Sequence, residues 1–468
     1  MRDPVERVQV VFATAEFAPL ARVGGLAAAA AGYVRELRAQ GAQVNVVLPD
    51  YSGFPLEDER SVAIDVPAWA GPATARTGHL DGVGEITLVD VPGIRRPHPY
   101  LQPDGTGWAD NDLRFFAFSA AVAGIVAATA PDILHLNDWH TATTVAHLAS
   151  PPPMVLTIHT LGYQGHTNTG WLAGFAYRRE LFEFEGACNP LVGGIRAADL
   201  VIAVSPNYAA EITSDAAGFG AAGILRGKGD RLVGIRNGID THEWNPADDP
   251  HLTGAYSAAD VRPKAALRTA MLDEFGLTAG SGPVIAMVTR LAHQKGVDIT
   301  LPIAPFLHTL GARLVLLGSG EEHLVAAAGH AQHAHPDEVS FRHGYDEGLA
   351  HRMFAGADVF VMPSRFEPCG LAQMQAMRYG TLPLVTDVGG LHDTVVDIDA
   401  DGANGTGVVI ATPTPIALMD GLHRMVRAWT QPRRRAAMQR RGMTTDWSWE
   451  HPVHEHRAWY QRLLEDRV

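Results

Sequence analysis

The chain has 468 residues, 46% hydrophobic and 19% charged, which excludes a disordered protein and predicts two to three folded domains. A formal net charge of −14 argues against a broad nucleic-acid-binding surface, although a local basic site for a phosphorylated small molecule remains compatible with it. The two cysteines, Cys188 and Cys369, fit a reducing compartment better than a disulfide scaffold.

The first residues run directly into an apolar segment and show no signal-peptide pattern. A nearly apolar run over residues 115–130 is short for a membrane span and contains Ser119 and Thr129, so it predicts a buried helix. We therefore expect a cytoplasmic protein with neither a membrane nor a nucleic acid as partner. A homo-oligomer is compatible with the sequence, which does not specify the oligomeric state.

Short aliphatic runs alternate with helical patterns along the chain, as in parallel α/β sheets whose strands are buried on both faces. Helical patterns cover residues 26–37, 113–128, 298–310 and 417–429. The predicted strands are Val8–Phe12, Val44–Leu48, Ile86–Val91, Ile133–Leu136, Val155–Ile158, Leu200–Val204, Val284–Val288, Arg313–Leu317, Val339–Phe341, Val359–Met362, Pro383–Val385 and Val408–Ile410.

A polar, turn-rich break between Trp244 and Pro263 divides these elements into two sets of about six strands. We therefore predict two Rossmann-like, doubly wound α/β domains with a cleft between them, over residues 1–244 and 245–446. A last segment, residues 447–468, contains a helical pattern, and its spacing alone does not say which domain it packs on.

The segment from Ser364 to Leu371 follows one predicted strand and precedes a helical pattern, so it lies where parallel α/β proteins bind ligands. It combines the carboxylate of Glu367, a proline and Gly370, which favours a ligand with both phosphate and hydroxyl groups. An ordinary connecting loop is the alternative.

Other polar residues also follow predicted strands. Arg290 and Lys295 come after residues 284–288 and could converge on one diphosphate, or could be two solvated surface cations. Asp138 with His140 and then His159 follow two successive strands, and Asn237 opens an Asn-Gly turn.

The four residues from Val23 to Leu26 recur as residues 388–391, and the paired glycines of each copy would allow close approach of a ligand, unless the match is coincidence.

Several classes of site are not indicated. The sequence contains neither His-Glu-x-x-His nor paired Cys-x-x-Cys, and the calcium-like run from Asp397 has Val408 where a bidentate glutamate is needed. No phosphate-loop motif and no Gly-x-Gly-x-x-Gly after the first strand is present, which removes the main support for kinases and dehydrogenases. We predict no metal site and no cofactor.

The motifs described above, taken in chain order, make the sequence resemble the glycogen and starch synthases, which are retaining glycosyltransferases of the GT-B fold. The resemblance extends from about residue 8 to about residue 450. The motifs that carry it, in family order, are Ala15–Leu20, Arg22–Leu26, Asp138–His140, Thr157–His159, Val204–Tyr208, Asn237–Asp240, Arg290 with Lys295, Arg365–Leu371 and Gly380–Pro383.

The resemblance implies roles for the matching residues. Arg290 and Lys295 would hold the donor diphosphate, and Glu367 would contact the hydroxyls of the donor sugar. His159 would lie at the reacting carbon with Asp138 nearby, and these five residues form the predicted catalytic set. The predicted substrate-binding set is Arg22, Gly24, Gly25, Trp108, Thr160, Asn237, Cys369, Gly370, Leu371, Val388, Gly389 and Gly390.

The resemblance also implies that the last helix packs on the N-terminal, acceptor-side domain, and that the C-terminal domain binds a nucleotide-diphosphate sugar.

Five positions depart from the family pattern. The family has Lys at Arg22, Asp at Ala28, Tyr at Trp108, Asn at Thr160 and Thr at Val388. Sites that hydrogen-bond a hydroxyl discriminate strongly between analogues, so such changes indicate changed substrates.

We accordingly predict a specialised secondary-metabolite member that couples a glucose-like or cyclitol donor to a small sugar or amino-sugar acceptor. The alternatives are an ADP-glucose-dependent glycogen synthase acting on an α-1,4-glucan, and a non-catalytic nucleotide-sugar-binding protein.

Overall fold

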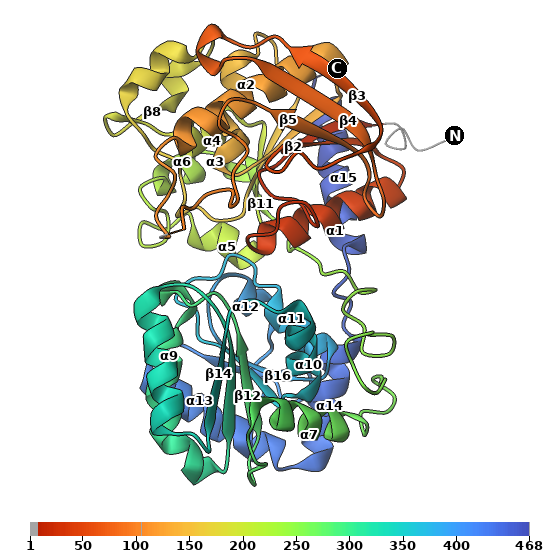
Figure 1. Ribbon diagram of the computed structural model, residues 1–468, viewed down its shortest axis with the longest axis vertical. Helices are drawn as coiled ribbons and strands as arrows, with labels where there is room; N and C mark the ends of the chain where they lie inside the picture. The colour runs from red at the N-terminus through yellow and green to blue at the C-terminus, as the bar shows by residue number, and fades with distance from the viewer. Residues whose placement is uncertain (1–7, 104, 468) are drawn as a thin grey trace. The chain divides into compact units, whose positions relative to one another are not determined.

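The computed structural model describes residues 8–103 and 105–467. The chain forms two compact units (Figure 1). Unit 1 comprises residues 1–238 together with 449–468, and unit 2 comprises residues 239–448. Each unit is built on its own sheet with helices packed against it.

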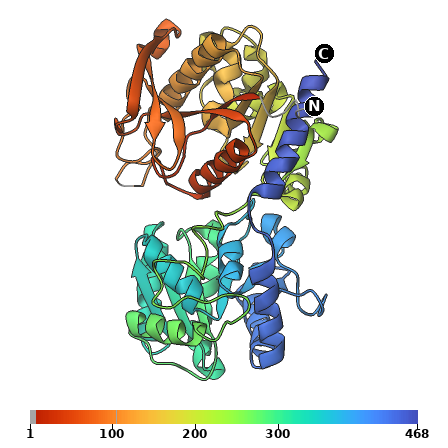
Figure 2. The same ribbon diagram turned by 90° about the vertical axis from the view of Figure 1, so that its right-hand side faces the viewer.

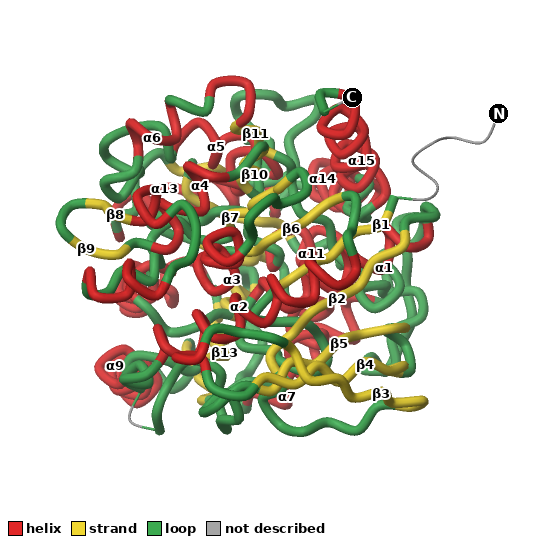
Figure 3. Tube along the Cα trace, turned by 90° about the horizontal axis from the view of Figure 1, so that it is seen from above, coloured by secondary structure: helices red, strands yellow, loops and turns green. Residues whose placement is uncertain are grey.

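In the described residues, unit 1 contains a nine-stranded sheet of order β11-β10-β7-β6-β1-β2-β5-β4-β3. The strands from β11 to β5 are parallel, whereas β3 and β4 pair antiparallel. Figure 3 shows the central strands side by side. Their bounds are β1 Gln9–Ala13, β2 Gln43–Pro49, β3 Glu57–Ile64, β4 Ala73–Leu80, β5 Gly84–Asp90, β6 Ile133–Asn137, β7 Met154–Ile158, β10 Leu200–Ala203 and β11 Leu232–Gly234.

Helices connect the parallel strands of unit 1, except between β2 and β5, where β3 and β4 intervene, and a small hairpin pairs β8 Glu183–Phe184 with β9 Ala187–Cys188. Side-chain caps define some helix starts: the Ser205 hydroxyl accepts the Tyr208 N–H at the start of α5. The helices are α1 Gly25–Ala39, α2 Asn111–Thr129, α3 Trp139–Ala142, α4 Pro190–Ala197, α5 Pro206–Glu211, α6 Ala222–Arg226 and α15 Glu450–Glu465. The short 3₁₀ turns are Ala68–Ala70, Thr143–His147, Thr169–Gly174, Arg179–Phe182 and Gly229–Arg231.

Helix α2 is long and apolar enough, among the described helices, to cross a membrane by length and composition. However, 67% of its apolar window is buried inside the protein. Both Phe115 and Phe116 have no exposed surface. This helix therefore has the burial of a core helix, as its sequence predicts.

Helix α15, from the end of the chain, packs in unit 1 beside α1 (Figure 2). Its Tyr460 hydroxyl lies 2.7 Å from the Tyr33 hydroxyl and also contacts Nδ1 of His135 on β6. The other ring nitrogen of His135 lies 2.7 Å from the Thr157 hydroxyl on β7. A buried hydrogen-bond network thus joins the last helix to the first helix and to the sheet.

Replacing Tyr460 with phenylalanine is expected to destabilise unit 1 by about 1–3 kcal/mol, because it leaves buried polar partners unpaired. The measurement is the denaturant midpoint of unfolding. Tyr163→Phe is the matched control, since the Tyr163 side chain is 56% exposed. Equal midpoints for the two variants would show that the network contributes nothing measurable.

In the described residues, unit 2 contains a six-stranded parallel sheet of order β14-β13-β12-β15-β16-β17. This is the Rossmann order, 3-2-1-4-5-6, in which the first three strands are added toward one edge of the sheet and the last three toward the other. The four central strands, β12, β13, β15 and β16, are buried apolar runs, as predicted, whereas the edge strand β14 ends in two exposed residues. Their bounds are β12 Val284–Val288, β13 Arg313–Gly318, β14 Val339–His343, β15 Val359–Met362, β16 Leu382–Thr386 and β17 Val408–Ile410.

One predicted helical segment of unit 2 is helical in the structure but mostly of the 3₁₀ type. The segment predicted as a helix over residues 298–310 is a short α8, Val297–Thr300, followed by a 3₁₀ stretch, Leu301–Leu310. Pro302 and Pro305 lack the N–H that a continuous α-helix needs. The remaining helical elements are α7 Lys264–Phe275, the 3₁₀ turn His293–Lys295, α9 Glu322–Ala334, α10 Glu347–Gly356, α11 Ala372–Arg378, α12 Gly389–Thr394, α13 Pro415–Trp429 and α14 Pro432–Thr444.

Candidate active site

The candidate site of unit 2 lies at the point where its strand order reverses. Strands β12 and β15 are neighbours there, and the loops that follow them leave the same edge of the parallel sheet. The first loop carries Arg290 and Lys295, and the second runs from Ser364 to Leu371. The fold therefore brings together residues that are about 70 positions apart in sequence.

Lys295 and Glu367 form a direct ion pair, with 2.6 Å between the lysine Nζ and the carboxylate Oε2. The same oxygen accepts a 3.0 Å hydrogen bond from the Ser364 hydroxyl. The side chains are 19% and 7% exposed, respectively, so the pair is largely shielded from water. A shielded ion pair of this kind holds both groups in a defined geometry.

Further contacts bind the two loops to each other. The Arg365 guanidinium donates two 2.8 Å hydrogen bonds to the Asp298 carboxylate, which lowers the pKa of Asp298. Gln294 accepts the Arg365 N–H at its carbonyl and donates its side-chain amide to the Phe366 carbonyl. These contacts hold the segment on both sides of Lys295 against the Glu367 loop.

The Val388–Gly390 loop, which follows β16, packs directly on the Glu367 loop. The Gly390 N–H donates a 3.0 Å hydrogen bond to the Glu367 carbonyl. Gly389 has φ +43°, and a Cβ added to it would lie 1.9 Å from the same carbonyl oxygen. A Cβ on Gly390 would lie 2.1 Å from the Cys369 carbonyl. Glycine is therefore required at both positions because two stretches of backbone touch there. The sequence had instead suggested that these glycines allow a ligand to approach.

Gly389→Ala is expected to lower the unfolding free energy by about 2 kcal/mol or more, because the new methyl group collides with backbone and φ is unfavourable. Gly24→Ala is the matched control, because Gly24 is the equivalent position in the other copy of the repeated four residues. Gly24 has φ −150°, and no atom lies within 4 Å of an added Cβ. We expect Gly24→Ala to stay within about 1 kcal/mol of wild type. Chemical denaturation of both variants distinguishes the positions, and similar losses would contradict this assignment.

The other predicted residues of unit 2 lie on the same loops. Arg290 is exposed, and its guanidinium donates a 3.3 Å hydrogen bond to Gln294. Cys369 is buried, Gly370 has φ +70° and Leu371 is the N-cap of α11. Val388 is half-buried and is the N-cap of α12.

In unit 1 the polar residues also gather where the strand order reverses, between β1 and β6. Asp138 follows β6 and has φ +54°, an uncommon conformation for a residue with a side chain. Its Oδ1 accepts a 2.8 Å hydrogen bond from the His159 N–H and a 3.4 Å one from the Thr160 N–H. The structure thus brings three predicted site residues, from the ends of β6 and β7, into contact.

Burial and hydrogen bonding set the protonation of these groups. Burial raises the pKa of Asp138 to about 7, against the opposing effect of the two N–H donors. Burial lowers the pKa of His159 to about 3, so its imidazole is neutral near pH 7. The Asn137 amide nitrogen donates to the Ala13 carbonyl, so its oxygen, 2.9 Å from His159 Nε2, accepts the imidazole N–H. His159 therefore presents an unprotonated Nδ1.

Glu16, which is absent from the candidate set, contacts the glycine loop that the candidate set includes. Its Oε2 accepts the N–H groups of Val23 and Gly24 at 3.0 and 2.8 Å, and its Oε1 accepts the Tyr100 hydroxyl at 2.9 Å. Burial raises the pKa of Glu16, opposed by these donors. The signal available in the sequence was a carboxylate just after the first strand. The N–H groups of the glycine loop are thus occupied by a carboxylate of the protein.

The remaining predicted residues of unit 1 are more dispersed. Arg22 and Gly25 lie in the exposed stretch that enters α1, which begins at Gly25. Trp108 is half-buried, and its indole N–H donates a 3.0 Å hydrogen bond to the His98 carbonyl. Asn237 is buried and follows β11, with its N–H 3.3 Å from the Val204 carbonyl.

The two Rossmann-like units, with polar residues at their strand-order reversals, define a GT-B glycosyltransferase. Residues 9–227 match the starch synthase catalytic domain, and residues 273–443 match the glycosyl transferases group 1 domain. The structure of the catalytic domain of starch synthase IV from Arabidopsis thaliana, bound to ADP and acarbose, superposes with a TM-score of 0.87. It is 29% identical and the match covers 98% of this chain and 99% of that one.

Curated relatives extend the match to whole proteins. A glycogen synthase of Halorhodospira halophila is 39% identical over 98% of this chain and 100% of its own length. A glycogen synthase of Granulibacter bethesdensis is 37% identical, with coverage of 98% and 100%. The sucrose-phosphate synthase of Thermosynechococcus elongatus, at 18% identity and a TM-score of 0.65, shares the fold. The chain belongs to the glycogen and starch synthase family of retaining glycosyltransferases, which confirms the resemblance.

Proposed function

We propose that this enzyme is a glycogen synthase that transfers glucose from ADP-glucose to an α-1,4-glucan. The observation that carries the proposal is the 39% identity to a glycogen synthase over 98% of this chain and all of the relative. The starch synthase with the similar structure was solved with ADP and acarbose, which supports an adenine nucleotide as leaving group and a saccharide as partner.

In unit 2, we assign Lys295 and Arg290 to the donor diphosphate and Glu367 to the hydroxyls of the donor sugar. Departure of a diphosphate from the sugar leaves an oxocarbenium-like carbon and builds negative charge on the leaving oxygen. A cation held in place beforehand stabilises that charge with little reorganisation. The Lys295–Glu367 pair supports this assignment because the contacts around it fix both groups before any ligand binds.

In unit 1, we assign His159 and Asp138 to the reacting sugar. The neutral imidazole can accept a hydrogen bond at its unprotonated Nδ1 without adding positive charge beside an oxocarbenium-like carbon. The Asp138 carboxyl orients the His159 backbone through the 2.8 Å hydrogen bond from its N–H. Asn237 and Thr160 are assigned to sugar contacts. Arg22, Gly25 and Trp108 are assigned to substrate contacts, and Gly24, whose N–H donates to Glu16, to close approach of the substrate to its backbone. A cytoplasmic location remains a prediction.

The specialised alternative rests on the five departures from the family pattern, and the comparisons give it no support. Arg22 and Ala28 are exposed, and Val388 is half-buried, so these positions can vary without disturbing a core. The two curated relatives described above are glycogen synthases across their full length. The comparisons therefore favour elongation of a glucan over coupling of a cyclitol to a small acceptor.

The test is incubation of the purified protein with labelled ADP-glucose and glycogen, followed by measurement of label in precipitated glucan. Sustained incorporation with ADP-glucose, above that with UDP- or GDP-glucose, is expected. A small labelled product without elongation of the glucan would favour the specialised enzyme that acts on a small acceptor. Binding of ADP-glucose without turnover on any acceptor would favour the nucleotide-sugar-binding protein.

A further inference from the structure

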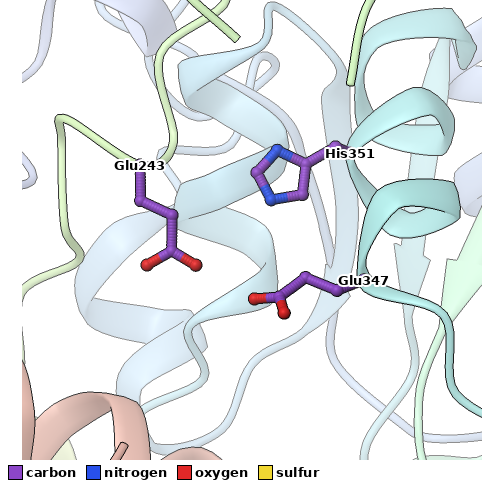
Figure 4. Close-up of side chains that lie close together, drawn as sticks. All are labelled: Glu243, Glu347 and His351. Carbon is purple, nitrogen blue, oxygen red and sulfur yellow. The ribbon is translucent and has the colours of Figure 1, made fainter. Parts of the chain in front are cut away.

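Three side chains in unit 2, apart from the loops of the candidate active site, converge on one point. Each of Glu243, Glu347 and His351 offers one ligand atom, and these atoms all lie within 4.8 Å of one another. Figure 4 shows the two carboxylates and the imidazole ring facing a common space. Glu347 and His351 come from successive turns of α10, four residues apart, and Glu243 comes from the segment that precedes α7.

His351 supplies an observation independent of the acidic pair. Its side chain is almost completely buried, with the residue 1% exposed. Its Nε2 is buried and has no hydrogen-bond partner among the described residues. The indole of Trp244 stacks on the ring, with 3.9 Å between centroids and 13° between planes, which fixes the ring plane. Buried polar nitrogens are nearly always paired, so an unpaired one in a polar cluster indicates a missing partner.

The other ring nitrogen determines what that partner is. Nδ1 of His351 lies 2.8 Å from Oδ2 of Asp249, which also accepts the Tyr379 hydroxyl. Nδ1 is therefore paired within the protein, and Nε2 is the ring nitrogen that has no partner among the described residues. An unpaired imidazole nitrogen whose neighbours are two carboxylates matches the arrangement of ligand atoms around a cation.

We propose that Glu243, Glu347 and His351 bind a divalent transition-metal ion of the Zn²⁺ type. An imidazole nitrogen with two carboxylate oxygens is a ligand set that Zn²⁺ accepts, with a fourth position left for water. Asp249 then occupies the position of the carboxylate that orients a metal-binding histidine through its second nitrogen. The sequence does not reveal the site, because Glu347 and His351 supply only two ligands and Glu243 lies about a hundred residues before them.

The location indicates a structural role for the ion. Glu243 belongs to the first residues of unit 2, which begins at Ile239. Glu347 and His351 belong to helix α10 of the same unit. A bound cation would cross-link the opening segment of unit 2 to α10. It would stabilise the folded unit, because the three ligands are together only in the native state.

The test uses the full chain, stripped with a chelator and dialysed, with Zn²⁺ alone as the probe. We expect calorimetric titration of the wild type to show a binding site for one Zn²⁺ per chain. This binding site should be absent from both Glu243→Gln and Glu347→Gln. The melting temperature should rise with Zn²⁺ in the wild type and not in these variants. Glu322→Gln, an exposed position at the start of α9, is the matched control and should behave as wild type.

A second variant tests the histidine without removing it from the core. Asp249→Asn is expected to weaken Zn²⁺ binding about 10- to 100-fold, as loss of an orienting carboxylate does at metal sites. Wild-type Zn²⁺ stoichiometry and thermal shift in the Glu243 and Glu347 variants would overturn the proposal. An absence of any Zn²⁺-dependent shift in the wild-type protein would overturn it as well.

Discussion

Lys295→Met is expected to lower kcat by about 10²- to 10³-fold, the loss typical of removing one preorganised group that stabilises a developing anion. The affinity for the glucan should change little, because the residue is assigned to the leaving diphosphate. Initial rates over a range of donor and glycogen concentrations separate these effects. Lys295→Arg should not restore the rate, because a planar guanidinium cannot replace the compact ammonium 2.6 Å from Glu367.

The control for Lys295→Met addresses stability. The single variant leaves the Glu367 carboxylate buried without its cation, at a cost of about 2–3 kcal/mol, below the range for fully buried pairs because Lys295 is 19% exposed. The double variant Lys295→Met/Glu367→Gln removes both charges and should regain most of that stability without regaining turnover. A double variant that is both stable and active would contradict the catalytic assignment.

Asp138→Asn is expected to stabilise the protein at pH 8 and to have progressively less effect toward pH 4. The pKa of Asp138 is raised from its ordinary value of 3.8 to about 7 in the folded state, chiefly by burial. Between these values the folded state holds a proton that the unfolded state has lost. The contribution of this group to stability is therefore complete below pH 3.8 and is lost as pH rises through about 7.

The amide does not ionise, so the variant avoids a cost on the order of 1.4 kcal/mol per unit of pKa shift. Thermal unfolding of wild type and variant at pH 4.5, 6 and 8 measures the difference. Asn tolerates positive φ, so the backbone at this position should be kept. Asp420→Asn, at an exposed position on α13, is the control for a general effect of the substitution. A difference that is constant with pH would refute the proposed burial of a protonated carboxyl.

The central strands were predictable because their signal is local. The runs at residues 284–288 and 359–362 are buried on both faces and appear as strands with those bounds. Strand β3 was missed because it is polar and almost wholly exposed, Glu57 to Ala63, at the edge of its sheet. Strand β4, beside it, was missed for the same lack of a continuous apolar run.

The candidate site shows the same division between local and long-range information. Lys295 and Glu367 could be found because each follows an apolar strand, where parallel sheets present ligand-binding groups. The Tyr100 partner of Glu16 could not be found, because it lies 84 residues away and meets Glu16 only in the folded unit. The cluster around His351 was missed for the same reason, since it depends on the return of a distant segment to α10.

The ion pair of Lys295 with Glu367 has a consequence for anion selectivity. Without a ligand, the Lys295 ammonium is already paired with the Glu367 carboxylate. An incoming anion must replace that carboxylate, so its binding free energy is only the difference between the two ion pairs. Free phosphate offers the cation a substitute for the carboxylate and offers Glu367 nothing in return. A sugar diphosphate offers both, a new anion for the lysine and hydroxyl donors for the displaced carboxylate. The resting pair would therefore act as a filter that favours the intact donor over abundant inorganic anions.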